Sequence, residues 1–268
     1  MSRRSRIRRR GWRGWGGIPA PSGGDPGGAF DPFSQAIFEA FTTPPTAERQ
    51  IIIDTAVKAL VAGGVWDNLD ALYMLAAADS QAALINWKNP GTYDGTLANA
   101  PTFVADQGFT GNGSNAEIDT GFNPSSAPAP NYVQDDACIF GRVRTAGDGL
   151  LWGAGSPTFI GFYETGAYLI RLNNGNGANT TTMARTGFIS VSRSSGAAQD
   201  VYHTGALVES DADVSNGVPG ATIKVLSNGG TFSNVQMSSF GVGGALTAPQ
   251  QAALAAAELA YMQAVGAV

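Results

Sequence analysis

Turn-forming residues that recur at short intervals constrain this chain more than any other feature. In the stretch NWKNPGTYDGTLANAPTFVADQGFTGNGSNAEIDTGFNP, which begins at Asn86, extended runs at residues 101–105 and 117–120 lie between Gly-rich and Asn-rich turns. These turns are Asp94-Gly95, Gly111-Asn112-Gly113 and Gly121. Such sequences join neighbouring antiparallel strands. The pattern therefore predicts an antiparallel sandwich or barrel in preference to a parallel sheet.

The remainder of the chain continues the alternation of short apolar runs and turns. The further strands that we expect lie at residues 137–144, 150–152, 159–162, 167–172, 181–185, 187–193, 199–203, 206–209, 222–226 and 236–242. Short antiparallel strands in this number fill two facing sheets. The 36 glycines and the low charged content of 14% are also typical of a turn-rich β-protein.

Helical periodicity is confined to the two ends of the chain. Residues 31–41 place four apolar side chains on one stripe, and a second helix is expected from the N-cap Thr46 to the stop at Gly63-Gly64. These two helices either pack on their own domain or form a collar that joins protomers or docks onto a larger particle. A last, Ala-rich helix beginning near Thr247 is expected to lie across one edge of the sandwich and to cover it.

Charge is distributed very unevenly along the chain. Seven of the 16 basic side chains lie before residue 14, and no acidic residue precedes Asp25. The rest of the chain carries nine basic against 21 acidic side chains, so the main body is a poor match for nucleic acid, which needs a positive surface. No window approaches 18 consecutive apolar residues, so no membrane insertion is expected. No secretory signal is recognised either, so assembly inside the producing cell is expected.

The order of several motifs carries a family resemblance over residues 46–268. The motifs are PTF at Pro101, GFTGNG at Gly108, EIDTGF at Glu117, GFYETGAYLIRL at Gly161, SVSRSS at Ser190 and an Ala-rich end closing with MQAVGA. In this order they resemble the concanavalin A-like, or laminin-G-like, jelly-roll domains of bacteriophage and prophage virion proteins. The resemblance makes residues 69–76, which are helical by propensity, the first strand of the jelly roll. Residues 79–84 follow as one short helical turn.

The resemblance implies a mostly β, concanavalin A-like jelly-roll sandwich with helices at both ends. It divides the chain into a flexible basic arm at residues 1–28, a helical collar at 29–64 and the jelly roll at 65–268. Proteins of this kind are tail fibres, spikes, head fibres or decoration proteins, and they often contact host glycans. The expected protein is therefore a homotrimeric virion component, assembled in the host cytoplasm, that recognises host surface polysaccharide. A purely architectural protein without a ligand is the alternative.

The basic arm is expected to become ordered only against a partner, because its composition cannot bury a core. Anchoring to other virion proteins is favoured over nucleic-acid binding or a solubilising role, given the acidic body. The anchor residues are Arg3, Arg4, Arg6, Arg8, Arg9, Arg10, Trp12, Arg13 and Trp15.

Glycan binding is expected where aromatic faces and amide side chains share a loop, because sugar rings stack on aromatics and their hydroxyls bond to amides. Trp152 and Tyr168 lie in apolar runs and are predicted to fill the core. The predicted glycan-binding residues are Tyr163, Asn173, Asn174 and Asn176.

Catalytic patterns are weak in this sequence, and we expect no enzyme. His203 is the single histidine and Cys138 the single cysteine, and the apolar run around Cys138 predicts a buried structural thiol. Glu117 and Asp119 share one face of a strand, with Ile118 facing the core, but the acidic motif of the related glucanases is incomplete, which argues against a glycan hydrolase.

No cofactor or metal site is predicted with any specificity. Calcium is the ion to consider, since it prefers oxygen donors and concanavalin-like sandwiches often bind it near one rim. The candidate ligands are Asp211, Asp213 and Asn216, or Asp135 and Asp136. Solvated turn carboxylates explain the same residues without a metal.

Overall fold

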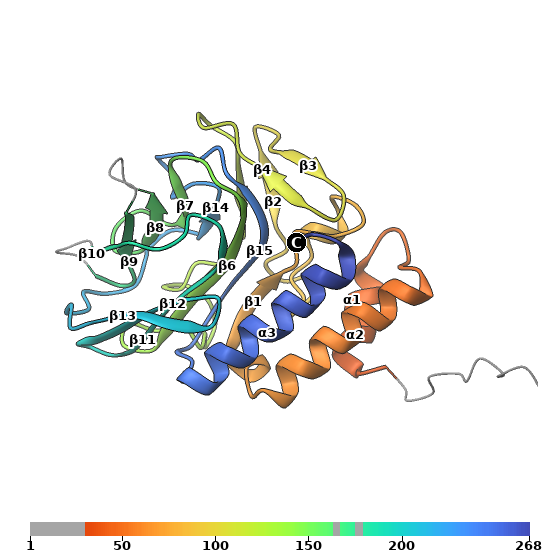
Figure 1. Ribbon diagram of the computed structural model, residues 1–268, viewed down its shortest axis with the longest axis horizontal. Helices are drawn as coiled ribbons and strands as arrows, with labels where there is room; N and C mark the ends of the chain where they lie inside the picture. Colours follow the sequence, from red (N-terminus) through yellow and green to blue (C-terminus); the bar gives the residue numbers. More distant parts are fainter. Residues whose placement is uncertain (1–29, 163–166, 175–178) are drawn as a thin grey trace, which may run out of the picture.

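A computed structural model describes residues 30–162, 167–174 and 179–268. Two antiparallel sheets face each other, and α-helices lie together on the outer side of one of them (Figure 1). The helices are α1 (Pro32–Ala40), α2 (Ala47–Ala62) and α3 (Ala248–Val265), with short 3-10 turns η1 (Trp66–Asn68) and η2 (Ala82–Leu84). The predicted mostly β sandwich with helices at both ends is confirmed.

The first sheet has eight strands in the order β13-β12-β11-β6-β15-β4-β3, with β1 also paired to β15. The long strands β6, β11 and β15 form its centre, and Ile139 of β6 is in register with both Val191 and Val242. Its strands are β1 (Leu69–Tyr73), β3 (Thr102–Val104), β4 (Gly108–Thr110), β6 (Ala137–Thr145), β11 (Gly187–Ser195), β12 (Ala198–His203), β13 (Ala206–Asp211) and β15 (Gln236–Gly243).

The second sheet has seven shorter strands in the order β10-β9-β8-β7-β14-β5-β2. They are β2 (Thr96–Ala98), β5 (Glu117–Asp119), β7 (Leu150–Gly153), β8 (Phe159–Phe162), β9 (Tyr168–Arg171), β10 (Asn179–Thr181) and β14 (Lys224–Val225). The two-residue β14 joins the pairs on its two sides, because Val225 is in register with both Ile118 and Trp152.

Most strands predicted from the sequence are present, including β1, which propensity alone would have made helical. The predicted strand at residues 181–185 is wrong, since β10 ends at Thr181, which is paired with the first residue of β9. Beyond that point the chain bends so that the Ala184 carbonyl accepts a hydrogen bond from the Tyr168 hydroxyl (3.0 Å). The short strands β2 and β4 lack apolar alternation, and sequence reasoning missed them.

Helices α2 and α3 begin at the predicted residues, Thr46 and Thr247. The hydroxyl of Thr46 accepts the N–H of Arg49 (3.2 Å) at the start of α2. At the start of α3, Thr247 and Gln250 form a capping box, and Gly266 ends this helix with φ of 76°, a conformation that glycine adopts without steric cost.

Two apolar cores use opposite faces of the same strands. On β6, Ile139 and Val143 face the second sheet, whereas Cys138 and Phe140 face the helices. The first core fills the sandwich, and the second is shared by the helices and the outer face of the first sheet. The second core includes Ile37, Ile53, Val57, Leu60, Leu72, Phe188, Leu254, Tyr261 and Met262.

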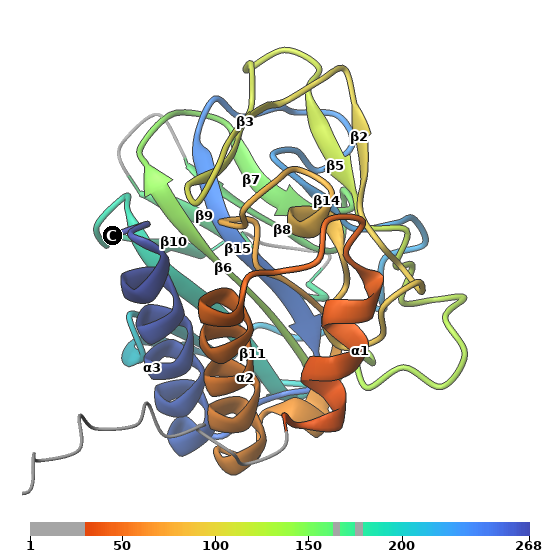
Figure 2. The same ribbon diagram turned by 90° about the vertical axis from the view of Figure 1, so that its right-hand side faces the viewer.

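The position of α3 corrects one expectation. We predicted that this helix would cover an edge of the sandwich, but it lies with α1 and α2 across the face of the first sheet (Figure 2). The physical reason is that the central strands carry large apolar side chains on both faces, so the outer face also has to be buried. The N-terminal helices pack on the same face and share that core.

A buried ion pair fixes α3 on the sheet. The guanidinium of Arg142, on β6, donates to both carboxylate oxygens of Glu258, on α3, at 2.6–2.9 Å. The hydroxyl of Ser239, on β15, donates to the same carboxylate (2.8 Å). Complete burial raises the pKa of Glu258, while Arg142 and Ser239 oppose that shift. Helix α3 and two of the central strands, β6 and β15, therefore meet at one charged group.

We expect Glu258→Gln to lower the free energy of unfolding by about 3–5 kcal/mol, because it leaves the buried Arg142 without a counter-charge. Chemical denaturation of the full chain measures the change. The control is Glu39→Gln, which alters an exposed carboxylate of α1 and is expected to stay within about 0.5 kcal/mol. Equal effects of the two substitutions would show that the pair does not hold the helix in place.

Candidate functional site

The predicted glycan-binding residues divide into two groups. Tyr163 and Asn176 lie outside the described residues, so their part in binding stays a prediction. Asn173 and Asn174 are buried, with 0% and 2% of their surface exposed. The basic arm with its anchor residues also lies outside the described residues.

Asn173 links strands and loops inside the protein. Its side-chain oxygen accepts the hydroxyl protons of Tyr132 (2.8 Å) and Thr158 (3.0 Å). Its amide nitrogen donates to the carbonyls of Val133 and Gln134, each at 3.0 Å. These bonds use the full capacity of the amide, so the expectation that Asn173 contacts a glycan is corrected to a structural role. Asn174 likewise donates to the carboxylate of Asp213.

Trp152 and Tyr168 are fully buried, as predicted. Cys138 is also buried in the way the sequence indicates, and its sulfur lies 3.4 Å from the Ser190 hydroxyl. Burial raises the pKa of this thiol to about 11, which makes it a poor nucleophile. His203 lies at the end of β12, and its Nε2 is 2.9 Å from the carbonyl of Thr186, the residue before β11.

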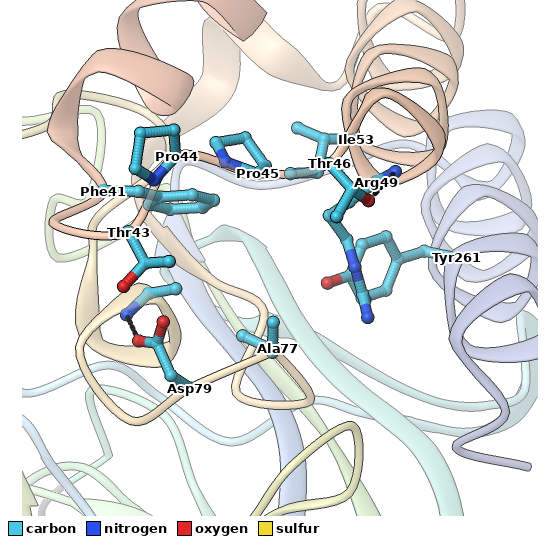
Figure 3. Close-up of a pocket in the computed structure, with 12 residues that line it drawn as sticks. Phe41, Thr43, Pro44, Pro45, Thr46, Arg49, Ile53, Ala77, Asp79 and Tyr261 are labelled. Carbon is cyan, nitrogen blue, oxygen red and sulfur yellow. Dashed lines mark hydrogen bonds between the residues drawn. The ribbon is translucent and has the colours of Figure 1, made fainter.

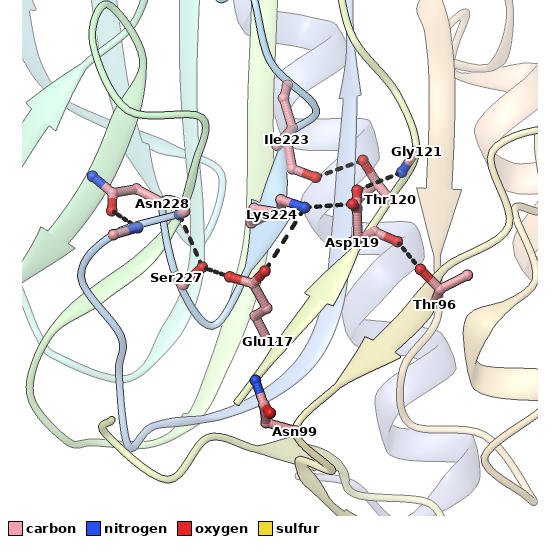
Figure 4. Close-up of polar contacts among 12 residues, drawn as sticks. Thr96, Asn99, Glu117, Asp119, Thr120, Gly121, Ile223, Lys224, Ser227 and Asn228 are labelled. Atoms are coloured by element: carbon pink, nitrogen blue, oxygen red, sulfur yellow. Dashed lines mark hydrogen bonds and ion pairs between the residues drawn. The ribbon is translucent and has the colours of Figure 1, made fainter. Parts of the chain in front are cut away.

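The strand-borne carboxylates Glu117 and Asp119 are held by a lysine. Lys224, on the neighbouring β14, bonds to Asp119 and lies 3.7 Å from Glu117 (Figure 4). Ser227 donates to the second oxygen of Glu117. Burial alone would raise the pKa of Asp119, but the hydrogen bond from Lys224 brings it below its usual value. Both carboxylates thus lie in an ion-pair cluster with Lys224, and the pKa of Asp119 is shifted away from the raised value that a general acid needs.

Three of the carboxylates proposed for calcium act on a buried arginine. Arg193 donates to the carbonyls of Leu172 and Asp213, each at 2.8 Å, and the charges of Asp135, Asp211 and Asp213 act on its guanidinium. A cationic group of the chain therefore already balances these carboxylates. Within the described ranges, no cluster of three or more His, Cys, Asp or Glu side chains is placed to hold a metal ion.

An apolar pocket of about 170 Å³ lies where the helices meet the sandwich. Phe41, Pro44 and Pro45 form one wall, and Arg49 and Tyr261 lie on the opposite side (Figure 3). Arg49 is bound to Asp106 (2.7 Å), and the Tyr261 hydroxyl donates to the Ala76 carbonyl (3.0 Å). Few polar groups converge on this space, so it does not suit a ligand rich in hydroxyl groups.

A more open groove of about 330 Å³ combines aromatic and polar groups. Its walls come from the start of β1, from the loop before β2 and from the loop after β5, so it lies where strands of both sheets end. The lining residues are Leu69, Asp70, Lys88, Asn89, Thr92, Tyr93, Phe122, Ala127, Pro128, Pro130 and Asn131.

The buried side chain of Asn86 organises the loop that forms one wall of this groove. Its oxygen accepts the N–H of Leu72 (3.0 Å) and of Lys88 (3.1 Å), and its nitrogen donates to the Thr92 carbonyl (2.9 Å). The carboxylate of Asp94 closes the other end by accepting the N–H groups of Asn86 (2.9 Å) and Gly91 (3.2 Å). The loop is therefore bonded to β1 and to itself before any ligand arrives.

Tyr93 provides the aromatic surface of the groove. Its ring is half-buried and packs edge-to-face on Phe122, with ring centroids 5.3 Å apart. Its φ of 60° lies in the left-handed region, which is unfavourable for a bulky residue. On the opposite wall, Pro128 and Pro130 restrict the backbone and reduce the entropy lost on binding.

The charged groups of the groove are already bonded within the protein. Lys88 donates to the Trp66 carbonyl (2.8 Å) and lies 5.5 Å from the Trp66 ring centroid. The carboxylate of Asp70 accepts the backbone N–H groups of Asn131 and Tyr132, each at 2.8 Å. Burial raises the pKa of Asp70 despite these bonds, and partial burial lowers the pKa of Lys88.

The sequence contained the signal for this groove, although our predictions did not use it. The segment from Lys88 to Tyr93 places an aromatic and an amide residue in one loop, which is the criterion that selected Tyr163, Asn173, Asn174 and Asn176. What the sequence could not show is that the loop containing Pro128 and Pro130 folds back to face this segment, about 40 residues away.

We expect Asn86→Ala to lower the free energy of unfolding by about 1–3 kcal/mol, because the buried N–H of Leu72 and the Thr92 carbonyl lose their partner. Chemical denaturation measures this change. Asn89→Ala, which alters an exposed amide of the same loop, is the control and is expected to be nearly neutral. A neutral Asn86→Ala would refute the organising role of this side chain.

No family model matches the chain, and no curated protein matches it in sequence. Solved structures do match. The binding domain of Paraclostridial Mosquitocidal Protein 1 has a TM-score of 0.52 at 14% identity, over 71% of this chain and 52% of that one. The receptor binding domain of the botulinum neurotoxin C/D mosaic serotype has a TM-score of 0.51 at 12% identity, over 71% and 51% of the two chains.

A further match is a structure of botulinum neurotoxin type C, a toxin whose entry into cells depends on interaction with two ganglioside molecules. Its TM-score is 0.50 at 10% identity, over 74% of this chain and 53% of that one. This chain spans about half the length of these solved structures. Identities this low show a shared β-sandwich fold and nothing finer.

Proposed function

We propose that this protein is a carbohydrate-recognition module that binds surface polysaccharide through the groove around Tyr93. The observation that carries the proposal is the pairing of an aromatic face with a polar rim. Tyr93 rests on Phe122, while Lys88, Asn89 and Thr92 stand at the edge. Sugar rings bury their apolar faces on such aromatics, and their hydroxyls bond to the surrounding polar groups.

The walls of the groove are held in position before a ligand binds, which supports the proposed binding role. Asn86 and Asp94 hold one wall by hydrogen bonds, and the prolines restrict the other. A preformed site loses less conformational entropy when it binds, and this matters for weak saccharide ligands. The ganglioside named for the matched neurotoxin structure agrees with this proposal, since a ganglioside presents sugar rings at a cell surface.

The positions of the strand-borne carboxylates Glu117 and Asp119 favour binding of the glycan without hydrolysis. Glu117 and Asp119 are both engaged with Lys224, away from the aromatic groove. A glycosidase needs one carboxyl group that stays protonated near neutral pH, and the shift at Asp119 is in the opposite direction. Burial raises the pKa of Asp70 in the groove, but the backbone N–H groups of Asn131 and Tyr132 bond to both of its oxygens and favour the ionised form. We therefore assign no catalytic residue.

The wider setting of the proposal rests on the sequence resemblance. In this setting the protein is a component of a phage particle, held by its basic arm and presented as a homotrimeric fibre, spike or decoration. None of the helices in residues 30–162, 167–174 and 179–268 is long and apolar enough to cross a membrane. A purely architectural particle protein is the competing function, and it would need no groove of this kind.

We expect Tyr93→Asn to weaken polysaccharide binding by about ten-fold or more, because an aromatic anchor is lost. Asparagine tolerates the left-handed backbone at this position, so the loop conformation is retained. Isothermal titration of the full chain against polysaccharides from candidate host cells measures the effect.

The matched control for Tyr93→Asn is Leu207→Asn. It changes a side chain that is 56% exposed on β13, at the opposite edge of the first sheet from β1. Affinity is expected to stay within about two-fold of the unchanged protein. Loss of binding in both variants, or in neither, would mean that the groove is not the glycan site.

We expect deletion of residues 1–28 to abolish incorporation into particles while the body still folds and binds polysaccharide. The reason is that both apolar cores consist of residues after 29, whereas all of the anchor residues lie between Arg3 and Trp15. Quantifying the protein in purified particles checks this. Normal incorporation of the shortened chain would disprove the anchoring role of the arm.

A further inference from the structure

The charges around the groove restrict which saccharides it can take, and we infer that its ligand is a neutral polysaccharide and not an acidic one. This inference rests on the proposed function, because it concerns the same site. It differs from what the ganglioside of the matched neurotoxin would suggest, since gangliosides carry acidic sugars.

Lys88 is the one basic side chain that lines the groove among the described residues. Its ammonium group is committed on several sides. It donates to the Trp66 carbonyl (2.8 Å), lies 5.5 Å from the centroid of the Trp66 ring and interacts with the charges of Asp67 and Asp70. An acidic sugar would have to compete with two carboxylates of the chain for one cation.

The carboxylates outnumber the cation at this site. Asp70 lines the groove directly, and Asp67 acts on Lys88 from the adjoining turn η1. Asp94 adds a third negative charge in the loop that carries Tyr93. A sugar carboxylate would therefore enter a region of like charge, which is unfavourable and is only partly screened in a half-buried groove.

Neutral sugar hydroxyls match the same groups well. Each oxygen of the Asp70 carboxylate accepts one backbone N–H, from Asn131 or Tyr132, and keeps a further lone pair for a hydroxyl donor. The ammonium of Lys88 has three donors, and the Trp66 carbonyl accepts one of them. A hydroxyl group both donates and accepts, so one sugar can satisfy Asp70 and Lys88 together.

The net negative charge of the chain outside its Arg-rich N-terminus also favours a neutral ligand. Outside the Arg-rich N-terminus the chain has nine basic and 21 acidic side chains, so an acidic polymer is repelled before it reaches the groove. A neutral polymer is not subject to this repulsion. The local and the long-range electrostatics thus favour the same class of ligand.

The test compares polymers that differ only in charge. Polygalacturonate, alginate and polysialic acid are each titrated against the full chain beside the same polymer after its carboxyl groups have been reduced to alcohols, with dextran and mannan as naturally neutral probes. We expect neutral forms to bind at least about ten-fold more tightly than their acidic counterparts, and their binding to change little with added salt.

A charge-reversal variant tests whether the carboxylates near Lys88 cause the preference for neutral over acidic polymers. Asp67→Lys changes a residue that does not line the groove, and we expect it to raise affinity for acidic polymers about five-fold or more while neutral binding stays within about two-fold. Glu39→Lys introduces the same change of charge on α1 and is the control, with no selective gain expected.

The outcomes separate the inference from the proposed function. Tighter binding of the acidic forms, or equal binding of both forms, overturns the inference and leaves the glycan groove intact, provided that Tyr93→Asn still weakens binding by about ten-fold or more. Binding of no polymer, charged or neutral, contradicts the proposed function and the inference together. A gain for acidic polymers in Glu39→Lys equal to that in Asp67→Lys would show that the local carboxylates do not set the preference.

Discussion

The contact between α3 and the central strands of the first sheet is the interaction on which the rest of the structure depends. β6 carries large apolar side chains on both faces, so the sheet cannot stand with one side in water. Helices cover that side, and the Arg142–Glu258 pair places one of them. A buried pair of this kind contributes little net stability compared with apolar packing, but a misplaced helix would leave both charges unpaired. The pair therefore specifies position more than it adds stability.

The helices bury one face of the central strands, and the opposite face of the same strands forms the core between the two sheets. Trp152, Val191 and Phe240 fill this space between the sheets. Because the strands of the second sheet are short, many of their side chains are near a loop, and the loops carry much of the exposed polar surface. Binding residues in such a fold are expected on loops held by a rigid scaffold, and the groove around Tyr93 is built from loops of this kind.

Two polar clusters that could suggest chemistry have structural explanations in this fold. Lys224 joins the carboxylates of β5 to β14, the shortest strand of the second sheet. Arg193 joins loops around Asp213 through backbone carbonyls. In each case a cation of the chain balances carboxylates that would otherwise repel one another. The groove differs because Asp70 and Lys88 retain hydrogen-bonding capacity toward the space between its walls.

The sequence by itself determined the fold class, most strands and the helix ends, because these depend on local patterns. Turn residues, alternating apolar runs and caps such as Thr46 act over a few positions. The tertiary structure decided which face α3 covers, that Asn173 is buried, and that residues near Tyr93 and Pro128 share one groove. Those features depend on contacts between segments far apart in the chain. Local periodicity carries no information about such contacts, since burial and pairing are settled only when the sheets close on each other.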